Sequence, residues 1–195
     1  MRQILDRVRA HLRDHFDTEP ASASVTFLGA EPIEVLRFSA DGVVHYVSLG
    51  CSRYPMTDPT EMVADPDRGP RAEVVVSLRN PEPATGLARS IAVLAATPAV
   101  DGVVLVPDAL IDLGSPLWTS PSVRVPFSAV LLGRSEIADL PLDPPRDPVQ
   151  FLSATPITAT EAAWVRLKGA EAMRQAWQTD GVDVLDPTRP AAQPR

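Results

Sequence analysis

The segment VVHYVSLGCSRYPM, residues Val43–Met56, places one strand and the loop that follows it, and the rest of the fold can be built outward from there. Its first half, Val43–Leu49, is a run of apolar and β-branched residues of the kind that forms a buried strand. The second half contains the single cysteine of the chain, Cys51, and one of its two tyrosines, Tyr54. Such a loop is either part of an active site or part of a surface that holds another molecule.

The flanking sequence predicts one domain of mixed α and β structure. An Asp-Gly pair in Ala40–Val43 predicts a tight turn and therefore a hairpin. Apolar residues at three-to-four spacing predict an amphipathic helix over residues 2–16. The other strand-like runs are Ser24–Leu28, Ile33–Phe38, Glu73–Leu78, Gly102–Val106, Phe127–Leu132, Gln150–Ile157 and Val182–Leu185. We expect a single α+β domain over residues 1–190, with helices packed on a mostly antiparallel or mixed β-sheet, and a disordered tail over 191–195.

Two further helices are predicted in the second half of the chain. An apolar pattern predicts a helix over about 85–96 that ends before Pro98. The sequence TATE at Thr158 forms a capping box, which predicts a helix from there to about residue 178. Gly169 lies inside this helix at a cost of ~1 kcal/mol relative to alanine, so we expect close packing against a neighbouring element there.

Composition and charge exclude several classes of protein. Hydrophobic residues make up 45% of the chain and charged residues 22%, which is typical of a globular domain. No window approaches the ~18 apolar residues of a membrane span. The charged N-terminal segment does not resemble a signal peptide, and a single cysteine favours the reducing cytoplasm. A net charge of −7 disfavours nucleic-acid binding and leaves room for a basic protein partner.

The loop offers two nucleophiles, and a hydrolase that uses Ser52 or Cys51 is the alternative function. The sequence around Ser52 approaches the G-x-S-x-G nucleophile elbow, but Tyr54 occupies the position of the second glycine, and a proline-rich loop follows. Cys51 would need a histidine or a helix N-terminus to lower its pKa. The nearest histidine in the sequence, His45, would lie ~20 Å away along an extended strand.

A metal site is considered at the sequence HLRDH, where His11 and His15 lie four residues apart on one helical face. The zincin signature also requires Glu directly after the first histidine, and Leu12 stands there. His45 is the remaining histidine that could complete such a site. Two solvated histidines are the ordinary explanation, and neither a calcium loop, nor G-x-G-x-x-G, nor a Walker lysine pattern is present. We therefore expect no metal, no cofactor and no enzymatic activity.

Two parts of the chain resemble the suppressor of fused (SUFU) family. YVSLGCSRYPM at Tyr46–Met56, followed by RAEVVVSL at Arg71–Leu78, is similar to the family's strand, its T/S-x-G-x-S turn with a Tyr-Pro-Met-like segment, and its next strand. The segment Phe151–Pro190 is similar to the family's strand with "PI", helix-opening Glu, mid-helix Gly and closing D-x-x-D-P-x-R. The resemblance extends over about residues 24–190. Cys51 and the long 57–70 loop depart from the family pattern.

The resemblance implies a non-catalytic protein-binding domain. Animal members of the family grip a short peptide, partly as an added strand. Bacterial relatives are single-domain, and many of them are regarded as immunity proteins that neutralise toxin domains. The partner expected here is another protein, either a basic toxin domain or a peptide. An exposed sheet edge beside the 50–56 loop would allow strand addition. The residues expected to contact the partner are Ser52, Arg53, Tyr54, Met56 and Glu73. In the alternative interpretation, Gly50, Pro55 and Met56 only turn the chain and plug the sheet.

Overall fold

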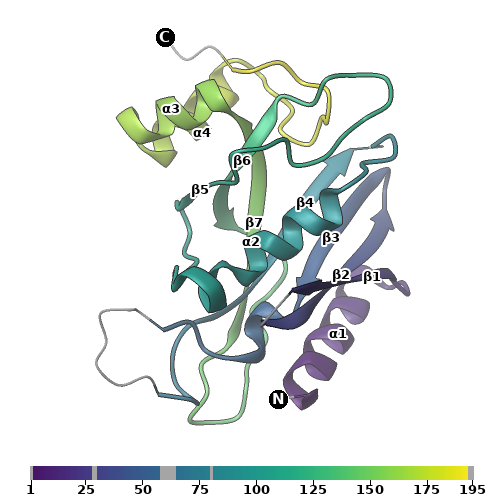
Figure 1. The fold of residues 1–195 in the computed structure, drawn as a ribbon, viewed down its shortest axis with the longest axis vertical. Helices are drawn as coiled ribbons and strands as arrows, with labels where there is room; N and C mark the ends of the chain where they lie inside the picture. The colour runs from purple at the N-terminus through teal and green to yellow at the C-terminus, as the bar shows by residue number, and fades with distance from the viewer. Residues whose placement is uncertain (1, 28–29, 58–64, 80, 193–195) are drawn as a thin grey trace.

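A computed structural model describes residues 2–27, 30–57, 65–79 and 81–192, and in these residues seven strands form one sheet (Figure 1). The elements in chain order are α1 (Arg2–Phe16), β1 (Ala21–Phe27), β2 (Ala30–Ala40), β3 (Val43–Leu49), the 3₁₀ turn η1 (Cys51–Arg53), β4 (Arg71–Arg79), α2 (Leu87–Asp101), β5 (Leu110–Asp112), β6 (Phe127–Arg134), β7 (Val149–Thr158), α3 (Ala159–Lys168) and α4 (Ala170–Thr179). The strand order is β1-β2-β3-β4-β7-β6-β5. Among the described pairs, β4 and β7 run parallel and the others antiparallel.

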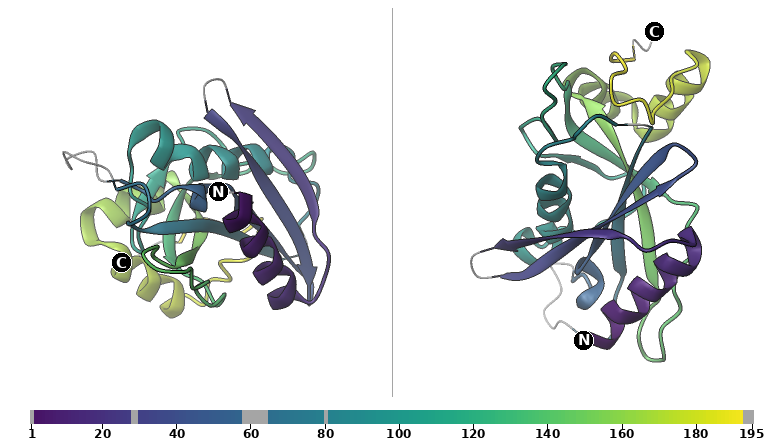
Figure 2. Two further views of the ribbon diagram at one scale, coloured as in Figure 1. Left: turned by 90° about the horizontal axis from the view of Figure 1, so that it is seen from below. Right: turned by 90° about the vertical axis from the view of Figure 1, so that its right-hand side faces the viewer.

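Helices cover both faces of the sheet. Helix α1 packs on one face, where Leu36, Phe38 and Val47 form a buried cluster with it. Helix α2 packs on the other face, and Figure 2 shows the two helices on opposite sides of the strands. Helices α3 and α4 cover the same face as α1. Phe151 and Ile157 of β7 are an even number of residues apart and therefore point to the same face of the sheet. Phe151 packs with α1, and Ile157 packs with α3 and α4. The predicted α+β class, with helices on a mixed sheet, is confirmed.

Local signals placed the first half of the chain correctly. The helix predicted over 2–16 is α1, and the strand predicted over Val43–Leu49 is β3. The hairpin between β2 and β3 turns at Asp41 and Gly42, which have φ angles of 50° and 75°. Both residues thus adopt the left-handed region that a two-residue hairpin turn requires, and Asp-Gly is a preferred pair there.

Helix α2 continues past Pro98, where an end was predicted, to Asp101. Proline removes the N–H that would bond to the carbonyl of Leu94, and the hydroxyl of Thr97 donates to this carbonyl instead, at 2.8 Å. The helix ends at Gly102, which has a φ of 67°. The strand predicted over Gly102–Val106 is therefore wrong, and the short strand β5 lies a few residues later, at Leu110–Asp112.

The predicted C-terminal helix is two helices that meet at Gly169. This glycine has φ 88° and ψ 167°, a combination that L-residues rarely adopt, so α3 ends and α4 begins there. An added Cβ would meet nothing within 4 Å, so the close packing expected at this position is also wrong. The strand predicted over Val182–Leu185 is absent from the described residues, where the Leu185 carbonyl accepts a single hydrogen bond, at 2.8 Å, from the N–H of Arg79.

Candidate functional site

The loop after β3 is built around the carboxylate of Glu73, which projects from β4 and is fully buried. Its Oε1 accepts the N–H of Gly50 at 2.9 Å, the N–H of Ser52 at 3.0 Å and the Ser52 hydroxyl at 2.6 Å, while its Oε2 accepts the hydroxyl of Ser48. All these donors are neutral groups from one short segment, 48–52. Glu73 therefore fixes the course of the chain as it leaves the sheet.

Gly50 is required where the chain turns into η1. Its φ of 146° disfavours any residue with a side chain, and an added Cβ would lie 2.9 Å from the Cδ1 atom of Ile33. The close approach lets the loop lie directly against β2. The first position of the loop is thus defined by backbone conformation and packing as well as by Glu73.

The chemistry of this cluster does not favour nucleophilic attack. Burial raises the pKa of Glu73, and hydrogen bonds from Gly50, Ser48 and Ser52 offset this only in part. Burial, and then the negative charge of Glu73, raise the pKa of Cys51 well above its ordinary value, so the thiol stays protonated. The Ser52 hydroxyl is buried and donates to Glu73. His45 instead makes a 2.8 Å contact with the Ser77 hydroxyl, so its ring does not activate either side chain.

Of the residues predicted to contact a partner, Tyr54 is the one that is well exposed, at 46% of its maximal area. Its hydroxyl donates to Glu31 at 3.1 Å, and this bond is the main cause of the raised pKa of Tyr54. Arg53 pairs with the same carboxylate at 2.6 Å and donates to the carbonyl of Pro32 at 3.2 Å. We call Glu31, Arg53 and Tyr54 the Tyr54 cluster. The cluster places an aromatic ring at the surface, with its hydroxyl bonded to Glu31.

The other predicted contact residues lie below this surface. Ser52 and Glu73 are inaccessible, and Met56 is 5% exposed. The sulfur of Met56 accepts the N–H of Leu105 at 3.3 Å, and its own N–H donates to the carbonyl of Pro70 at 2.7 Å. Met56 therefore fills the core beside residues that had been predicted as a strand. The partner role of all five residues stays a prediction, and the side chain of Arg53 is 13% exposed, far less than that of Tyr54.

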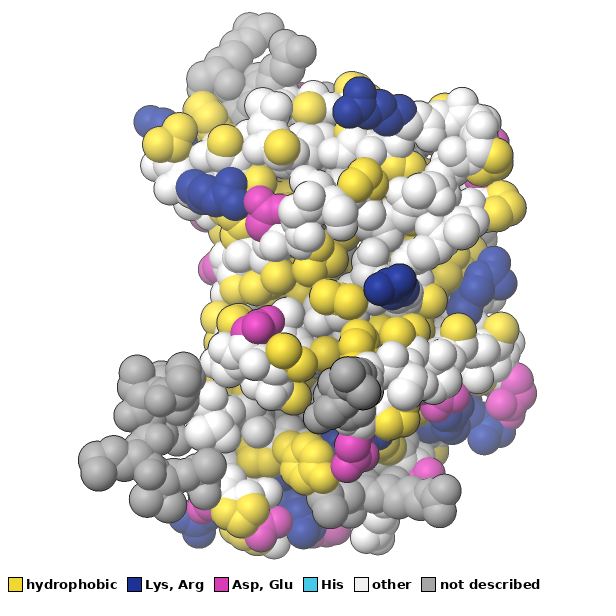
Figure 3. All heavy atoms as spheres, viewed as in Figure 1, with side chains coloured by type: hydrophobic (Ala, Val, Ile, Leu, Met, Phe, Trp, Pro, Cys, Tyr) yellow, Lys and Arg dark blue, Asp and Glu magenta, His cyan; other side chains and the backbone are white. Residues whose placement is uncertain are grey.

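Two cavities of about 330 Å³ each flank Tyr54. The first lies between the loop and the end of α2, and its walls include Ile33, Met56, Ala96 and Pro98. The second lies on the other side of the ring, toward the first turn of α1. On the face that carries α2, hydrophobic side chains form a band across the molecule with charged side chains scattered around it (Figure 3). Tyr54 thus stands between two hollows of similar size.

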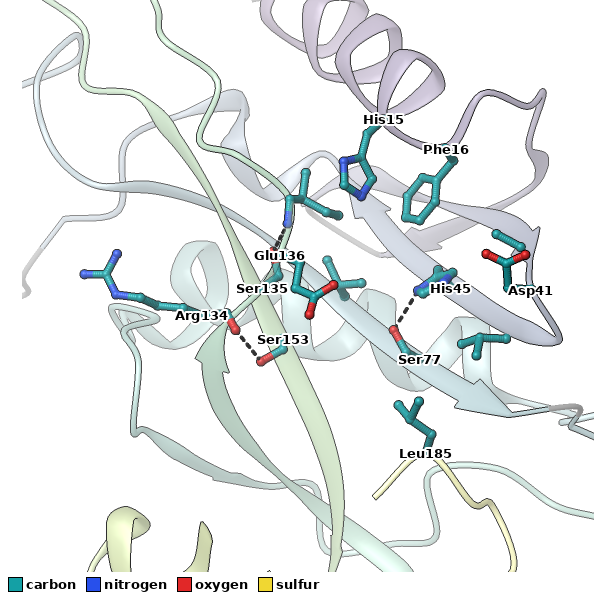
Figure 4. Close-up of a pocket in the computed structure, with 14 residues that line it drawn as sticks. His15, Phe16, Asp41, His45, Ser77, Arg134, Ser135, Glu136, Ser153 and Leu185 are labelled. Carbon is teal, nitrogen blue, oxygen red and sulfur yellow. Dashed lines mark hydrogen bonds between the residues drawn. The ribbon is translucent and has the colours of Figure 1, made fainter. Parts of the chain in front are cut away.

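A third hollow, of about 430 Å³, lies where the sheet splits between β4 and β7 (Figure 4). The parallel ladder ends at the pair Val75 and Ser153. Beyond that point β4 pairs with β3 and β7 pairs with β6, and Leu185 of the C-terminal segment closes the far end of the split.

This split corrects the expectation of an open sheet edge beside the 50–56 loop. The strand that leads into the loop, β3, is paired on both sides, and the outer strands of the described sheet are β1 and β5. Strand addition next to the loop would therefore require β2 or β4 to give up its pairing with β3. The unpaired edges nearest the centre of the sheet lie in the split instead.

The three histidines do not converge on one point. His11 makes a 2.7 Å contact with the carbonyl of Ala138 and stacks on Phe151, whereas His15 and His45 line the hollow of Figure 4. Burial, and then the charge of His15, lower the pKa of His45, while the charge of Glu136 acts in the opposite direction. No group of three or more His, Cys, Asp or Glu side chains within the described ranges could hold a metal ion.

A second buried carboxylate, Glu161, marks an arrangement that the sequence analysis found only in part. Its capping box with Thr158 is present as predicted. The same carboxylate also accepts Arg189 at 2.7 and 3.1 Å and the indole N–H of Trp177 at 3.0 Å. The N–H of Ala192 adds a bond at 3.2 Å, although this residue falls in the range predicted as tail. The tail boundary itself stays a prediction, since residues 193–195 lie outside the described residues.

Comparisons with known proteins agree with this architecture. A family model described as "Suppressor of fused protein (SUFU)" matches residues 29–190. No curated protein matches the chain. None of the helices in the described ranges is long and apolar enough to cross a membrane.

Solved structures with the same fold include a SUFU homologue from Neisseria gonorrhoeae, which is 18% identical with a TM-score of 0.69 over 99% of this chain and 98% of that one. A chain of the Sufu–Fu complex is 16% identical, with a TM-score of 0.65 over 98% of this chain and 90% of that one. Suppressor of Fused from Drosophila is 16% identical, with a TM-score of 0.68, and this chain spans 51% of its length. At these identities the likeness concerns the fold.

Proposed function

The chain belongs to the suppressor of fused family, and on that premise we propose that it is a non-catalytic domain that binds another protein through the Tyr54 cluster. A structural neighbour of the same fold comes from a Sufu–Fu complex, in which Sufu is assembled with Fu. That precedent supports a protein as the partner here. It does not identify the partner, because the likeness lies in the fold.

The observation that carries the proposal is an exposed aromatic ring on a rigid base. Tyrosine and arginine are enriched at the centres of protein interfaces, where a side chain that is already ordered loses little entropy on binding. Tyr54 is held by Glu31, and the backbone beneath it is held by Glu73. A protein partner could cover the ring and fill the cavities on either side without rearranging the loop.

We further propose that the partner is a basic toxin domain, which this chain would neutralise as an immunity protein in a bacterial cytoplasm. The net charge of −7 supports a basic partner, because complementary charge accelerates encounter and disfavours acidic competitors. An inhibitor of this kind needs only to cover a surface on the toxin. A catalytic group of its own is not required.

The experiment is a pull-down of the tagged protein from its native host, read by mass spectrometry and repeated with Tyr54→Ala. A genuine partner should be enriched by the wild-type protein, and its affinity should fall by at least about tenfold in the variant, as expected for an aromatic anchor. Because Tyr54 is exposed, its removal should leave the unfolding curve nearly unchanged.

The matched control is Leu167→Ala, which removes an exposed hydrophobic side chain of α3, far from the Tyr54 cluster in the fold. Wild-type affinity is expected for this variant. Equal loss of affinity in both variants would indicate nonspecific capture through apolar surface. A partner that binds Tyr54→Ala as tightly as wild type would refute the role given to the cluster.

A further inference from the structure

Arg71, the first residue of β4, carries a buried positive charge that makes no salt bridge with a described carboxylate. Its side chain is 2% exposed. Its terminal nitrogens donate to the carbonyls of Ser52 at 2.9 Å, Arg53 at 3.0 Å and Asp67 at 3.4 Å, and its Nε has no hydrogen-bond partner among the described residues. The other arginine buried to this extent, Arg189, is paired with Glu161. A buried cation without a directly bonded counter-ion is costly, and the carboxylates of Asp67 and Asp147 act on Arg71 only through their charge, so the Arg71 site has room for a further anionic partner.

Two more arginines line the same cavity, the one of about 330 Å³ on the α1 side of Tyr54, which we call the Arg71 pocket. Its lining residues are Gln3, Ile4, Arg53, Tyr54, Pro66, Asp67, Arg71 and Arg146. Asp67 is the one acidic residue in this lining, and it already pairs with Arg146 at 3.2 Å. Burial, and then the nearby charge of Arg146, lower the pKa of Arg71, while the charges of Asp67 and Asp147 act in the opposite direction. With three arginines and one aspartate, the lining of the pocket is positive on a protein of net negative charge.

The N-terminus of α1 adds to this positive potential. Gln3 and Ile4 belong to the first turn of a helix of 15 residues, and that turn contains no acidic side chain. Backbone N–H groups in a first turn lack partners within the helix, and the helix dipole places partial positive charge there. The first turn of α1, the start of β4 at Arg71 and the segment that carries Arg146 line this one cavity. Helix N-termini that meet arginines are well suited to bind oxyanions.

We propose that the Arg71 pocket binds a carboxylate that the partner protein presents from an acidic side chain or its C-terminus. This inference rests on the proposed function, because Tyr54 belongs to both the cluster and the pocket wall. The carboxylate would lie between Arg71 and Arg146, while the ring of Tyr54 would pack against the residue that carries it. In this proposal the partner is basic overall, and one of its carboxylates binds in the Arg71 pocket. That contact would fix the orientation of the partner on the domain.

The first arm of the test uses the free chain and needs no partner. N-acetylglutamate is titrated into ¹⁵N-labelled protein, and the Nε–Hε resonances of Arg71 and Arg146 are followed by NMR. We expect both to shift with one saturating curve. Arg146→Gln should weaken this binding about tenfold or more, as expected for a lost charge-assisted hydrogen bond. Arg146 is exposed, so the variant should fold. Arg134→Gln removes the same charge at the split in the sheet and should leave the affinity unchanged.

Shifts spread evenly over all arginines, or equal binding by Arg146→Gln and wild type, would overturn the pocket as an anion site. Inorganic phosphate is titrated in parallel. If phosphate saturates the site and N-acetylglutamate does not, the site takes a phosphoryl group and the carboxylate assignment is wrong. Arg71→Lys, which keeps the charge but loses the planar fork, should bind N-acetylglutamate more weakly than wild type.

The second arm measures the affinity of the captured partner for Arg146→Gln and for Tyr54→Ala. Loss of affinity in both variants supports a carboxylate delivered by the partner. If Tyr54→Ala loses affinity and Arg146→Gln does not, the proposed function survives and the partner carboxylate is refuted. If neither variant loses affinity while N-acetylglutamate binds the free chain, the pocket serves a small free anion, and the protein-binding role of this surface fails separately.

Discussion

Burial disfavours the charged form of two carboxylates, Glu73 and Glu161, and the protein compensates for it differently at the two sites. Glu73 is surrounded by neutral donors from the segment directly after β3, and its pKa is raised because burial outweighs them. Glu161 is also buried, and burial by itself would raise its pKa. Hydrogen bonds from Arg189, Thr158 and Trp177, together with the positive charge of Arg189, lower the pKa of Glu161 below its ordinary value instead. One carboxylate organises a short loop, and the other ties the C-terminal segment to α3.

The difference separates the part of the molecule that presents a surface from the part that holds the fold together. Neutral donors around Glu73 shape a loop without a second charge, and this loop carries Tyr54 to the surface. The ion pair of Glu161 and Arg189 joins residues that are 28 positions apart and closes the core around Trp177. We therefore expect variants of Glu161 and Arg189 to act on stability, and variants around Glu73 to act on the shape of the loop.

The largest effect is expected for Arg189→Met, which leaves Glu161 buried without its cation. Removing one partner of a buried ion pair typically costs about 3–5 kcal/mol, so the free energy of unfolding in urea should fall by that amount. The double variant Glu161→Gln/Arg189→Met should recover part of the loss, since no buried charge remains unpaired. A single variant as stable as wild type would show that the pair does not hold the C-terminal segment.

A smaller effect is expected for Glu73→Gln. The substitution keeps the size of the side chain and leaves no buried charge unpaired. The amide, however, has an NH₂ group in place of one carboxylate oxygen, and this donor would face some of the four donors that now bond to Glu73. The loss should be about 2 kcal/mol in the same urea assay, typical of buried hydrogen bonds left unmade. A loss as large as that of Arg189→Met would mean that Glu73 supports the core as much as the ion pair does, and would contradict the different roles given to the two carboxylates.

Gly169→Ala should cost about 1 kcal/mol, because alanine is strained at φ 88° and ψ 167°. The break at Gly169 redirects α4, which carries Trp177 to the carboxylate of Glu161. Thermal unfolding provides the measurement. In a continuous helix the same substitution would stabilise the protein by a similar amount, so a higher melting temperature would contradict the two-helix arrangement.

The pH dependence of stability should differ in sign between the two sites. Glu73 has a raised pKa in the folded state, so its contribution is present below the ordinary value of 4.5 and is lost as pH rises through the folded value. Glu161 has a lowered pKa, so its contribution is present above the ordinary value and is lost as pH falls through the folded value. Urea unfolding of wild type, Glu73→Gln and Glu161→Gln from about pH 4 to 8 measures both. The cost of Glu73→Gln should shrink with rising pH, and that of Glu161→Gln with falling pH.

Most features governed by local sequence were predictable, with α2 at Pro98 as an exception, and features governed by distant contacts were not. The Asp41-Gly42 turn and the capping box at Thr158 follow from residues next to one another. The path of α2 through Pro98 depends on the neighbouring Thr97 hydroxyl, a local detail that the breaker rule for proline overlooks. The parallel pairing of β4 with β7 joins segments far apart in the chain.

The same division applies to the candidate site. Tyr54 was predicted from its residue type, and the structure leaves it exposed, whereas Met56 and Glu73 are covered by segments that no pattern in the loop identifies. Arg71 was missed because what sets it apart is its burial without a salt bridge, and neither property can be read from the sequence. The arginine that opens the run RAEVVV was the available signal.

Hydrogen–deuterium exchange of the protein with and without its captured partner tests most directly where binding takes place. The account predicts new protection of the backbone around Arg53 and Tyr54 and around Arg71 and Arg146, with exchange in α3, α4 and the segment 180–192 unchanged. Protection confined to α3, α4 and that C-terminal segment, with the Tyr54 loop exchanging as in the free protein, would contradict it.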